Sequence, residues 1–257
     1  MLFHRLVAYL RYRLQAKNRH GIHSPYVYWV SDVICRQKHH YYSWKAIEHE
    51  RRQLLANRES LYHEDLGALG QSAQKRIASI ASNSALPDKY GRLLFQLVLQ
   101  QSPRTGIELG TSLGLGTAYL ASANTACTWH TLEGSKEVLD QAKQVHQNLG
   151  LHNINTIHGN FDTTLPAILT SLPYVDVVFI DGNHHYDATM RYLNWCLPKL
   201  SANAMVIIDD IYWSSGMTKA WKACIALPDF ELSMDFYRLG MLLRRPGQAK
   251  EHFVLQY

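Results

Sequence analysis

The feature that most constrains the fold is a repeated alternation of short β-type runs and helical patterns, which begins near Pro103. One of the intervening segments starts at Ser135, a residue typical of a helix N-cap, and closes on Gly150. Strands that alternate with helices predict a parallel sheet covered by helices on both faces. The five runs are 105–110, 128–133, 153–159, 175–181 and 204–209.

Two more β-type runs, 230–236 and 238–245, follow near the C-terminus. They succeed each other too closely for a parallel return, which needs a long crossover, so we expect an antiparallel pair. The sequence therefore predicts a doubly wound α/β fold whose seven-stranded sheet is mostly parallel and carries an antiparallel edge hairpin.

The first eighty residues have a different character. Helical patterns cover 2–14, 21–34 and 41–60, whereas 63–72 has the glycines and polar residues of a loop. We expect a helical extension or lid over residues 1–80 and an α/β domain over 81–257. The first helix has one apolar face, made of Leu2, Phe3, Leu6, Val7, Leu10 and Leu14.

A glycine-rich loop follows the first strand and opens the next helix. Such loops let backbone amides and a helix N-terminus approach a ligand closely. The dinucleotide pattern G-x-G-x-x-G fails here, because Ser112 or Tyr119 falls on a glycine position. The pattern that fits is E-x-G-x-x-x-G, from Glu108, Gly110 and Gly114, and it resembles motif I of the class I S-adenosylmethionine (SAM) methyltransferases. A purely structural turn is the alternative.

Polar residues also follow the next two strands. Glu133 lies 25 positions after Glu108, near the spacing of about 20 residues at which an acid binds ribose hydroxyls; a solvated surface glutamate is the alternative. Asn160 and Phe161 follow the third strand and are suited to binding and stacking an adenine. Ligands bind at the carboxyl ends of strands in open α/β sheets. The expected SAM-binding residues are Glu108, Gly110, Thr111, Ser112, Gly114, Glu133, Gly134, Asn160, Phe161 and Asp181.

Three carboxylates follow the fourth and fifth strands. Asp181 ends one run, and Asp209 and Asp210 end the other. Because like charges repel, we expect a cationic group to share their site. Mg²⁺ is suitable, since it binds a few carboxylates together with water and substrate oxygens. In the alternative, Asp181 faces SAM while Asp209 or Asp210 caps a helix or faces solvent.

Residues from about 80 to 257 resemble the catechol O-methyltransferase-like branch of the SAM methyltransferases. In that branch an Asp after strand four and an Asp-Asn pair after strand five hold Mg²⁺, and the matching positions are Asp181, Asp209 and Asp210. Asp210 departs from the pattern, because it stands in place of asparagine. The motif RHGIHSP near the N-terminus is similar to one in a bacterial subgroup with a helical extension. The resemblance implies a Rossmann-like fold, SAM as cofactor and a divalent cation.

His184 occupies the position of that branch's catalytic lysine. A histidine titrates near neutral pH and is suited to deprotonating a hydroxyl acceptor. Two adjacent residues that leave a strand cannot both point the same way, so we assign the base to His184, with Asp181 beside it, and a turn-stabilising role to His185. The alternative is that His184 only bonds a backbone carbonyl.

The net charge of +5 is unevenly distributed. Residues 1–60 hold 11 Lys and Arg against 4 Asp and Glu, whereas residues 61–257 hold 15 against 17. The basic front end suits a nucleic-acid or acidic substrate, a membrane surface, or simply a solvated face. No apolar run is long enough to cross a bilayer, no secretory signal is recognised, and four widely spaced cysteines suggest a reduced, cytoplasmic protein.

We therefore expect a SAM-dependent methyltransferase that acts on a hydroxyl of a small-molecule acceptor, with or without a divalent metal. The alternatives are a tRNA base methyltransferase and a non-catalytic SAM-binding protein. The sequence does not name the acceptor, and a homodimer remains open.

Overall fold

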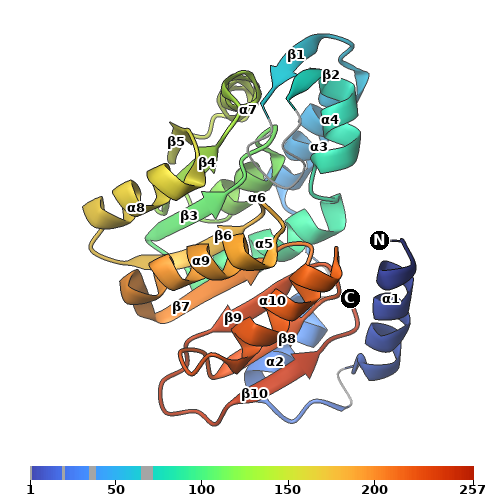
Figure 1. The fold of residues 1–257 in the computed structure, drawn as a ribbon, viewed down its shortest axis with the longest axis vertical. Helices are drawn as coiled ribbons and strands as arrows, with labels where there is room; N and C mark the ends of the chain where they lie inside the picture. Colours follow the sequence, from blue (N-terminus) through green and yellow to red (C-terminus); the bar gives the residue numbers. More distant parts are fainter. Residues whose placement is uncertain (1, 19–20, 35–38, 65–71) are drawn as a thin grey trace. The chain divides into compact units, whose positions relative to one another are not determined.

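The structure, a computed structural model, describes residues 2–18, 21–34, 39–64 and 72–257. The chain forms two compact units. The central unit is His39–Pro173, and the terminal unit combines Met1–Lys38 with Tyr174–Tyr257. Figure 1 shows the elements of both units coloured along the sequence.

The central unit is built on parallel strands that pair in the order β3-β4-β5. Ile107, Leu109, Trp129 and Leu132 on these strands are fully buried, as expected of a parallel sheet covered on both faces. The strands are β3 (Thr105–Leu109), β4 (Thr128–Glu133) and β5 (Ile154–His158), and the helices that follow them are α6 (Leu115–Ala123), α7 (Lys136–Asn148) and α8 (Phe161–Ser171).

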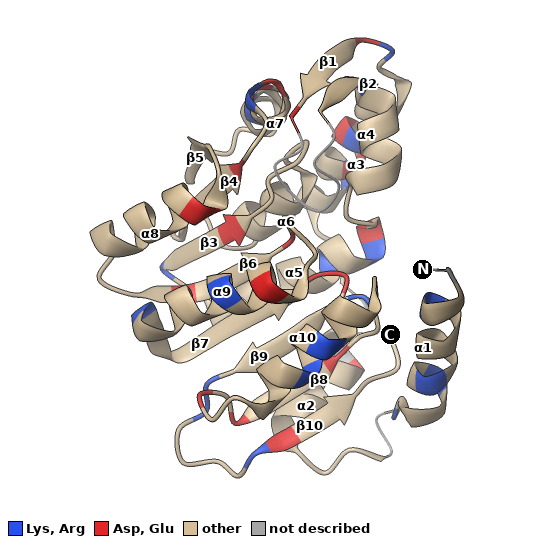
Figure 2. Ribbon diagram, in the orientation of Figure 1, with Lys and Arg blue, Asp and Glu red and all other residues tan. Residues whose placement is uncertain are grey.

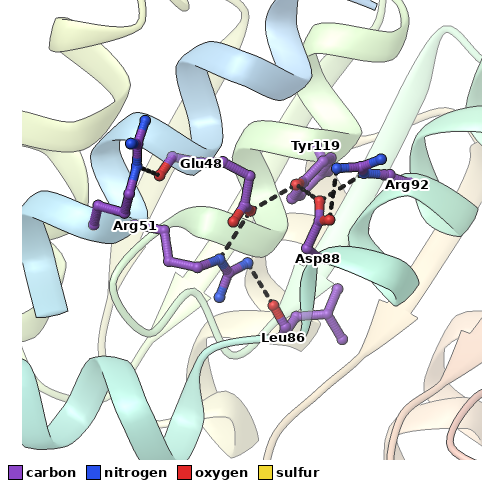
Figure 3. Close-up of polar contacts among 7 residues, drawn as sticks. Glu48, Arg51, Leu86, Asp88, Arg92 and Tyr119 are labelled. Atoms are coloured by element: carbon purple, nitrogen blue, oxygen red, sulfur yellow. Dashed lines mark hydrogen bonds and ion pairs between the residues drawn. The ribbon is translucent and has the colours of Figure 1, made fainter. Parts of the chain in front are cut away.

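Helices α3 (Tyr42–Ala56), α4 (Ile77–Ser84) and α5 (Asp88–Gln101) complete the central unit. The hydroxyl of Tyr119 on α6 lies 2.9 Å from Glu48 Oε1 on α3 and 2.7 Å from Asp88 Oδ1 on α5 (Figure 3). Arg51 pairs with Glu48 at 2.9 Å, and Arg92 pairs with Asp88 at 2.7 Å. One buried tyrosine thus connects three helices through two ion pairs.

Gly91 on α5 permits this arrangement. A Cβ atom at Gly91 would lie 2.3 Å from Cε2 of Tyr119, a distance that no relaxed side chain tolerates. The glycine is required by the close approach of α5 and α6, not by a turn.

A short antiparallel hairpin was not predicted by the sequence. Its strands are β1 (Ser60–His63) and β2 (Ala73–Arg76). Both are largely exposed, so neither carries the buried run by which a strand is recognised. The predicted loop at 63–72 lies mostly outside the described residues.

In the terminal unit the strands pair in the order β10-β8-β9-β7-β6. β6 and β7 are parallel, and β9 is antiparallel to both β7 and β8, which confirms the predicted edge hairpin. β10 adds a strand that was not predicted, parallel to β8. The bounds are β6 (Val175–Ile180), β7 (Leu200–Ile208), β8 (Leu232–Asp235), β9 (Gly240–Leu243) and β10 (Glu251–Val254), with α9 (Tyr186–Cys196), the 3₁₀ turn η3 (Leu197–Lys199) and α10 (Ser215–Ala226).

The N-terminal helices belong to the same unit as the C-terminus. They are α1 (Leu2–Gln15), α2 (Pro25–Trp29) and the π-helical turn η2 (Val30–Ile34). The hydroxyl of Tyr12 donates to the carbonyl of Leu255 at 2.6 Å, and the backbone amide of Tyr257 donates to that hydroxyl at 3.1 Å. His4 Nε2 lies 3.0 Å from Thr218 Oγ1 on α10.

The predicted fold class, a mostly parallel α/β sheet with an antiparallel edge and N-terminal helices, is confirmed. The predicted boundary near residue 80 separates a helical extension from the methyltransferase domain, and the two compact units do not test it. None of the helices in the described ranges combines the length and apolarity that spanning a bilayer requires. The described cysteines, Cys127, Cys196 and Cys224, are buried and form no disulfide with one another.

Candidate functional site

The glycine loop after β3 has the backbone conformation that its sequence predicts. Gly110 and Gly114 have φ values of 106° and 83°, in the left-handed region that side chains disfavour. The amide of Gly110 donates to the carbonyl of Leu132 on β4 at 2.9 Å, and Gly114 stands at the N-cap of α6. A Cβ atom at Gly114 would also lie 2.6 Å from Nε2 of His146. Packing against α7 is therefore a second reason for this glycine.

Glu108 is buried beside this loop, at 1% exposure. Its Oε2 accepts hydrogen bonds from the hydroxyls of Thr117 and Thr131, and Thr111 Oγ1 lies 2.6 Å from Thr131 Oγ1. Burial raises the pKa of Glu108 to about 7, against the lowering effect of the two hydroxyls. Its Oε1 is buried and has no hydrogen-bond partner among the described residues. A buried carboxylate oxygen without a donor suits a cationic ligand group, as SAM has at its methionine end.

Glu133 at the end of β4 holds the loop directly. Its two carboxylate oxygens accept hydrogen bonds from the backbone amides of Ser112, at 2.9 Å, and Ser135, at 3.0 Å. Burial raises the pKa of Glu133, and these amides, together with that of Gly134, oppose the change. Three amides leave about one of the four lone-pair positions of the carboxylate, so it can accept a ribose hydroxyl while it orders the loop.

The remaining residues of the central unit have mainly structural contacts. Asn160 caps α8, since its side chain accepts the amide of Asp162 at 2.8 Å, and Phe161 is the first residue of that helix. Ser135 stands at the N-cap of α7, but its hydroxyl does not cap the helix. Instead it donates to the carbonyl of Tyr62 on β1, because the unpredicted hairpin lies against it. The adenine-binding role of Asn160 and Phe161 stays a prediction.

In the terminal unit, the parallel pairing of β6 and β7 brings the predicted carboxylates together. Ile180 pairs with Ile208, and the amide of Asp209 donates to the carbonyl of Ile180 at 2.9 Å. Asp181 and Asp209 therefore leave adjacent strand ends, and their side chains are hydrogen bonded to each other. Asp210 follows with a φ of 53°, in the left-handed region, where the strand has ended.

The cation that accompanies these carboxylates is Arg238, in the turn between β8 and β9. Its Nε lies 2.8 Å from Asp209 Oδ1 and 3.2 Å from Oδ2, and its terminal nitrogen lies 2.7 Å from Oδ2. Asp210 Oδ1 is 3.7 Å from the same guanidinium. The side chain of Asp209 is fully buried, and that of Arg238 is three-quarters buried. The contact with Asp209 is thus a bidentate pair with little access to solvent.

Burial and neighbouring charges set the protonation of the three acids. Burial would raise the pKa of Asp209, but Arg238 outweighs it and the net pKa falls. Burial and then the charge of Asp209 raise the pKa of Asp181 well above its usual range. The same two causes raise that of Asp210. Asp181 is therefore the carboxyl that carries a proton most readily, and this proton forms its hydrogen bond to Asp209.

Asp181, Asp209 and Asp210, the predicted metal ligands, do not fit a divalent ion as they are arranged. Both oxygens of Asp209 are bonded to Arg238, and Asp181 shares its hydrogen bond with Asp209. Among the residues that the structure describes, no three His, Cys, Asp or Glu side chains come together as metal ligands would. The metal set stays a prediction, and the guanidinium already supplies the positive charge for which it was invoked.

His184 lies beside the carboxylates, as predicted. Its Nε2 is 3.9 Å from Asp181 Oδ1, a distance for an ion pair but too long for a hydrogen bond. Its side chain is 23% exposed, so it is accessible to an acceptor. His185 instead occupies the N-cap position of α9. The two histidines therefore have different environments.

Two residues of these clusters were not selected from the sequence. The sequence signalled only that a cation should lie near the three acids. It did not point to Arg238, because this residue is 29 positions away from Asp209 and reaches it through a hairpin. His146 gave no signal at all. It is buried, its Nε2 lies 3.1 Å from the carbonyl of Gly114, and burial lowers its pKa to about 4. It is therefore a neutral support of the glycine loop.

Residues 107–211 match a family described as a methyltransferase domain. No curated protein matches the chain.

The fold is similar to several solved structures. One is a methyltransferase of Podospora anserina bound to S-adenosylhomocysteine, at 15% identity over 88% of this chain and 97% of that one, with a TM-score of 0.62. Another is an O-methyltransferase of Bacillus cereus in complex with S-adenosylhomocysteine, at 18% identity over 84% and 96%, with a TM-score of 0.59. A third is the O-methyltransferase TomG of Streptomyces achromogenes in complex with SAM, at 16% identity over 85% and 94%, with a TM-score of 0.58. The TM-scores show a common fold, and at identities this low the likeness shows nothing beyond the fold.

Proposed function

We infer that this chain, whose residues 107–211 match a methyltransferase-domain family, is a SAM-dependent enzyme that methylates a hydroxyl group of a small molecule. The observation that carries the inference is the pair formed by His184 and Asp181 at the end of β6, with 3.9 Å between Nε2 and Oδ1. A base at a strand end is where open α/β enzymes carry their chemistry. The structural relatives named as O-methyltransferases support the hydroxyl as acceptor.

The residues of the central unit would bind the cofactor. Gly110 has a positive φ that disfavours any residue with a side chain. Glu133 offers its remaining lone pair to the ribose, and Glu108 offers an unpartnered oxygen to the cationic amino acid portion. SAM is the methyl donor that such a loop suits, and relatives of this fold were crystallised with SAM or its product. These residues bind and orient the donor but take no part in proton transfer.

The residues of the terminal unit would handle the acceptor. His184 removes the hydroxyl proton as the oxygen attacks the methyl group. The O–CH₃ bond forms, the S–CH₃ bond breaks, and its electron pair stays on sulfur, which gives S-adenosylhomocysteine. The proton remains on the imidazole, where the nearby carboxylates of Asp209 and Asp210 stabilise the positive charge that it acquires.

Arg238 would hold the carboxylates in place. Without a cation, three acids at one sheet edge would repel one another; with it, Asp209 stays charged and Asp181 keeps its orientation toward His184. No step of this reaction passes through a metal ion.

The test compares His184→Gln with His185→Gln, its neighbour at the N-cap of α9. Each protein is incubated with SAM and a panel of phenols and catechols, and the release of S-adenosylhomocysteine is measured against pH. We expect His184→Gln to lower kcat by a factor of about 10²–10⁴ and to change the dependence of the rate on pH, with SAM affinity unchanged. His185→Gln should leave the rate within a few-fold of the parent.

An unchanged rate or an unchanged pH profile in His184→Gln would remove the assigned base. Release of S-adenosylhomocysteine with tRNA but with no hydroxyl acceptor would replace the small-molecule reaction by base methylation. Tight SAM binding without turnover on any acceptor would instead identify a non-catalytic SAM-binding protein.

A further inference from the structure

Helix α1 contacts the rest of its unit through its polar and aromatic side. Ala8 and Tyr12 are 7% and 3% exposed. The guanidinium carbon of Arg5 lies 4.9 Å above the ring of Trp213, and the hydroxyl of Tyr237 donates to the carbonyl of Arg5 at 3.2 Å. The chain after the helix is fixed as well, since the amide of Lys17 donates to the carbonyl of Val254 at 2.8 Å. The orientation of α1 within the terminal unit is therefore well determined by its contacts.

This orientation leaves the apolar face formed by Phe3, Leu6, Leu10 and Leu14 outside. Phe3 is 80% exposed, Leu6 55%, Leu10 54% and Leu14 88%. These residues are three or four positions apart and so form one row along the helix. A row of large apolar side chains that faces water is unusual in a folded chain and indicates an interaction site.

The charges around the row are all of one sign. At about 100° per residue, Arg11 and Arg13 fall on opposite sides of it. Figure 2 shows basic and no acidic residues on α1, and the sequence has its first acidic residue at Asp32. Arginines that flank an apolar face can keep their guanidinium groups in the polar layer while the face enters lipid.

We propose that α1 is an interfacial helix that attaches the protein to an anionic membrane surface through Phe3, Leu6, Leu10 and Leu14, with Arg11 and Arg13 contacting lipid phosphates. The helix has 14 residues, too few to span a bilayer but enough to lie in its surface. A second copy of the chain suits the face poorly. An α1–α1 contact would bring the arginines of both copies together, with no carboxylate on the helix to pair with them. RNA could bind the arginines through its phosphates but would leave the row of apolar side chains exposed to water.

The experiment uses the full chain in vesicle flotation, with vesicles of phosphatidylcholine alone or mixed equally with phosphatidylglycerol. We expect the protein to float with the anionic vesicles only, and less as salt is added. The double variant Leu6→Glu/Leu10→Glu should reduce binding at least about tenfold. The matched control is Leu55→Glu/Leu99→Glu, which adds the same two charges at exposed leucines outside α1, 44% and 42% exposed on α3 and α5. This control should bind like the parent.

A second pair of variants tests the charges. Arg11→Gln/Arg13→Gln should weaken binding by roughly fivefold for each arginine, whereas Arg52→Gln/Arg58→Gln, at exposed positions of the central unit, should not. Circular dichroism and SAM titration confirm that each variant is folded.

Three outcomes would overturn the proposal. One is a parent protein that does not float with anionic vesicles. Another is flotation that Leu6→Glu/Leu10→Glu leaves unchanged. The third is a parent dimer, measured by light scattering, that this variant converts to a monomer, since a second copy would then cover the face.

Discussion

The substitution Glu108→Gln separates the stability of the fold from its function. In the folded chain the pKa of Glu108 is about 7, because burial disfavours the charged form, against 4.5 for an ordinary glutamate. A difference of this size corresponds to about 3 kcal/mol of stability. Because the folded value is the higher one, this contribution is complete below about pH 4.5 and is lost as the pH rises to about 7.

Glutamine keeps the favourable contacts of Glu108 and removes its charge. Its carbonyl oxygen can accept the hydroxyls of Thr117 and Thr131 as Oε2 does now. We therefore expect Glu108→Gln to be more stable than the parent at pH 8, by up to about 3 kcal/mol, and similar to it at pH 4.5. The gain in stability is at most this value, because the amide group of glutamine would take the position of Oε1, where it finds no hydrogen-bond partner among the described residues.

Urea unfolding at the two pH values measures this difference. The control is Glu251→Gln at an exposed position, where the change should stay within about 0.5 kcal/mol. In the same variants, SAM affinity should fall about tenfold or more for Glu108→Gln, since a hydrogen bond to a charged group contributes roughly 1.5–3 kcal/mol. A variant that is less stable at pH 8, or equally changed at both pH values, would refute the assignment of a strained buried charge.

Two further substitutions test the packing and the buried pair. Arg238→Gln should cost about 3–5 kcal/mol of unfolding free energy because Asp209 is left buried without its cation, and adding Asp209→Asn should recover most of this loss in urea unfolding. Mg²⁺ should raise the Tm of Arg238→Gln but not that of the parent, and a parent stabilised by Mg²⁺ would contradict the role given to the guanidinium. Gly91→Ala should cost about 1–3 kcal/mol through overlap with Tyr119, whereas Gly216→Ala, a helical glycine with 3.6 Å to its nearest neighbour, should be neutral or slightly stabilising.

The sequence predicts the parts of this fold that local patterns encode. The strands β3, β4, β6, β7, β8 and β9 were found because each is a largely buried run between turn signals. The half-exposed β5 was found from its place in the alternation of strands and helices. The strand ends at Glu133, Asp181 and Asp209 followed directly. The strands β1, β2 and β10 were missed because their residues are largely exposed, so periodicity has little to detect.

The residues that the sequence could not assign depend on tertiary contacts. Arg238 reaches Asp209 from a hairpin turn, and no spacing between them indicates that they meet. Ser135 has the sequence of a helix cap, yet its hydroxyl bonds to Tyr62 because of a hairpin that was not foreseen. The first helix was recognised by its apolar face, but only tertiary contacts such as those of Arg5 and Tyr12 show that this face is outside.

Calorimetric titration of SAM into the parent protein and Glu133→Ala tests the central claim, that the glycine loop and the acid after β4 bind this cofactor. We expect one site in the parent and at least about tenfold weaker binding in the variant, because the carboxylate that orders Ser112 and offers acceptors to the ribose is lost. The absence of binding to the parent, or equal affinity in a folded Glu133→Ala protein, would contradict the account.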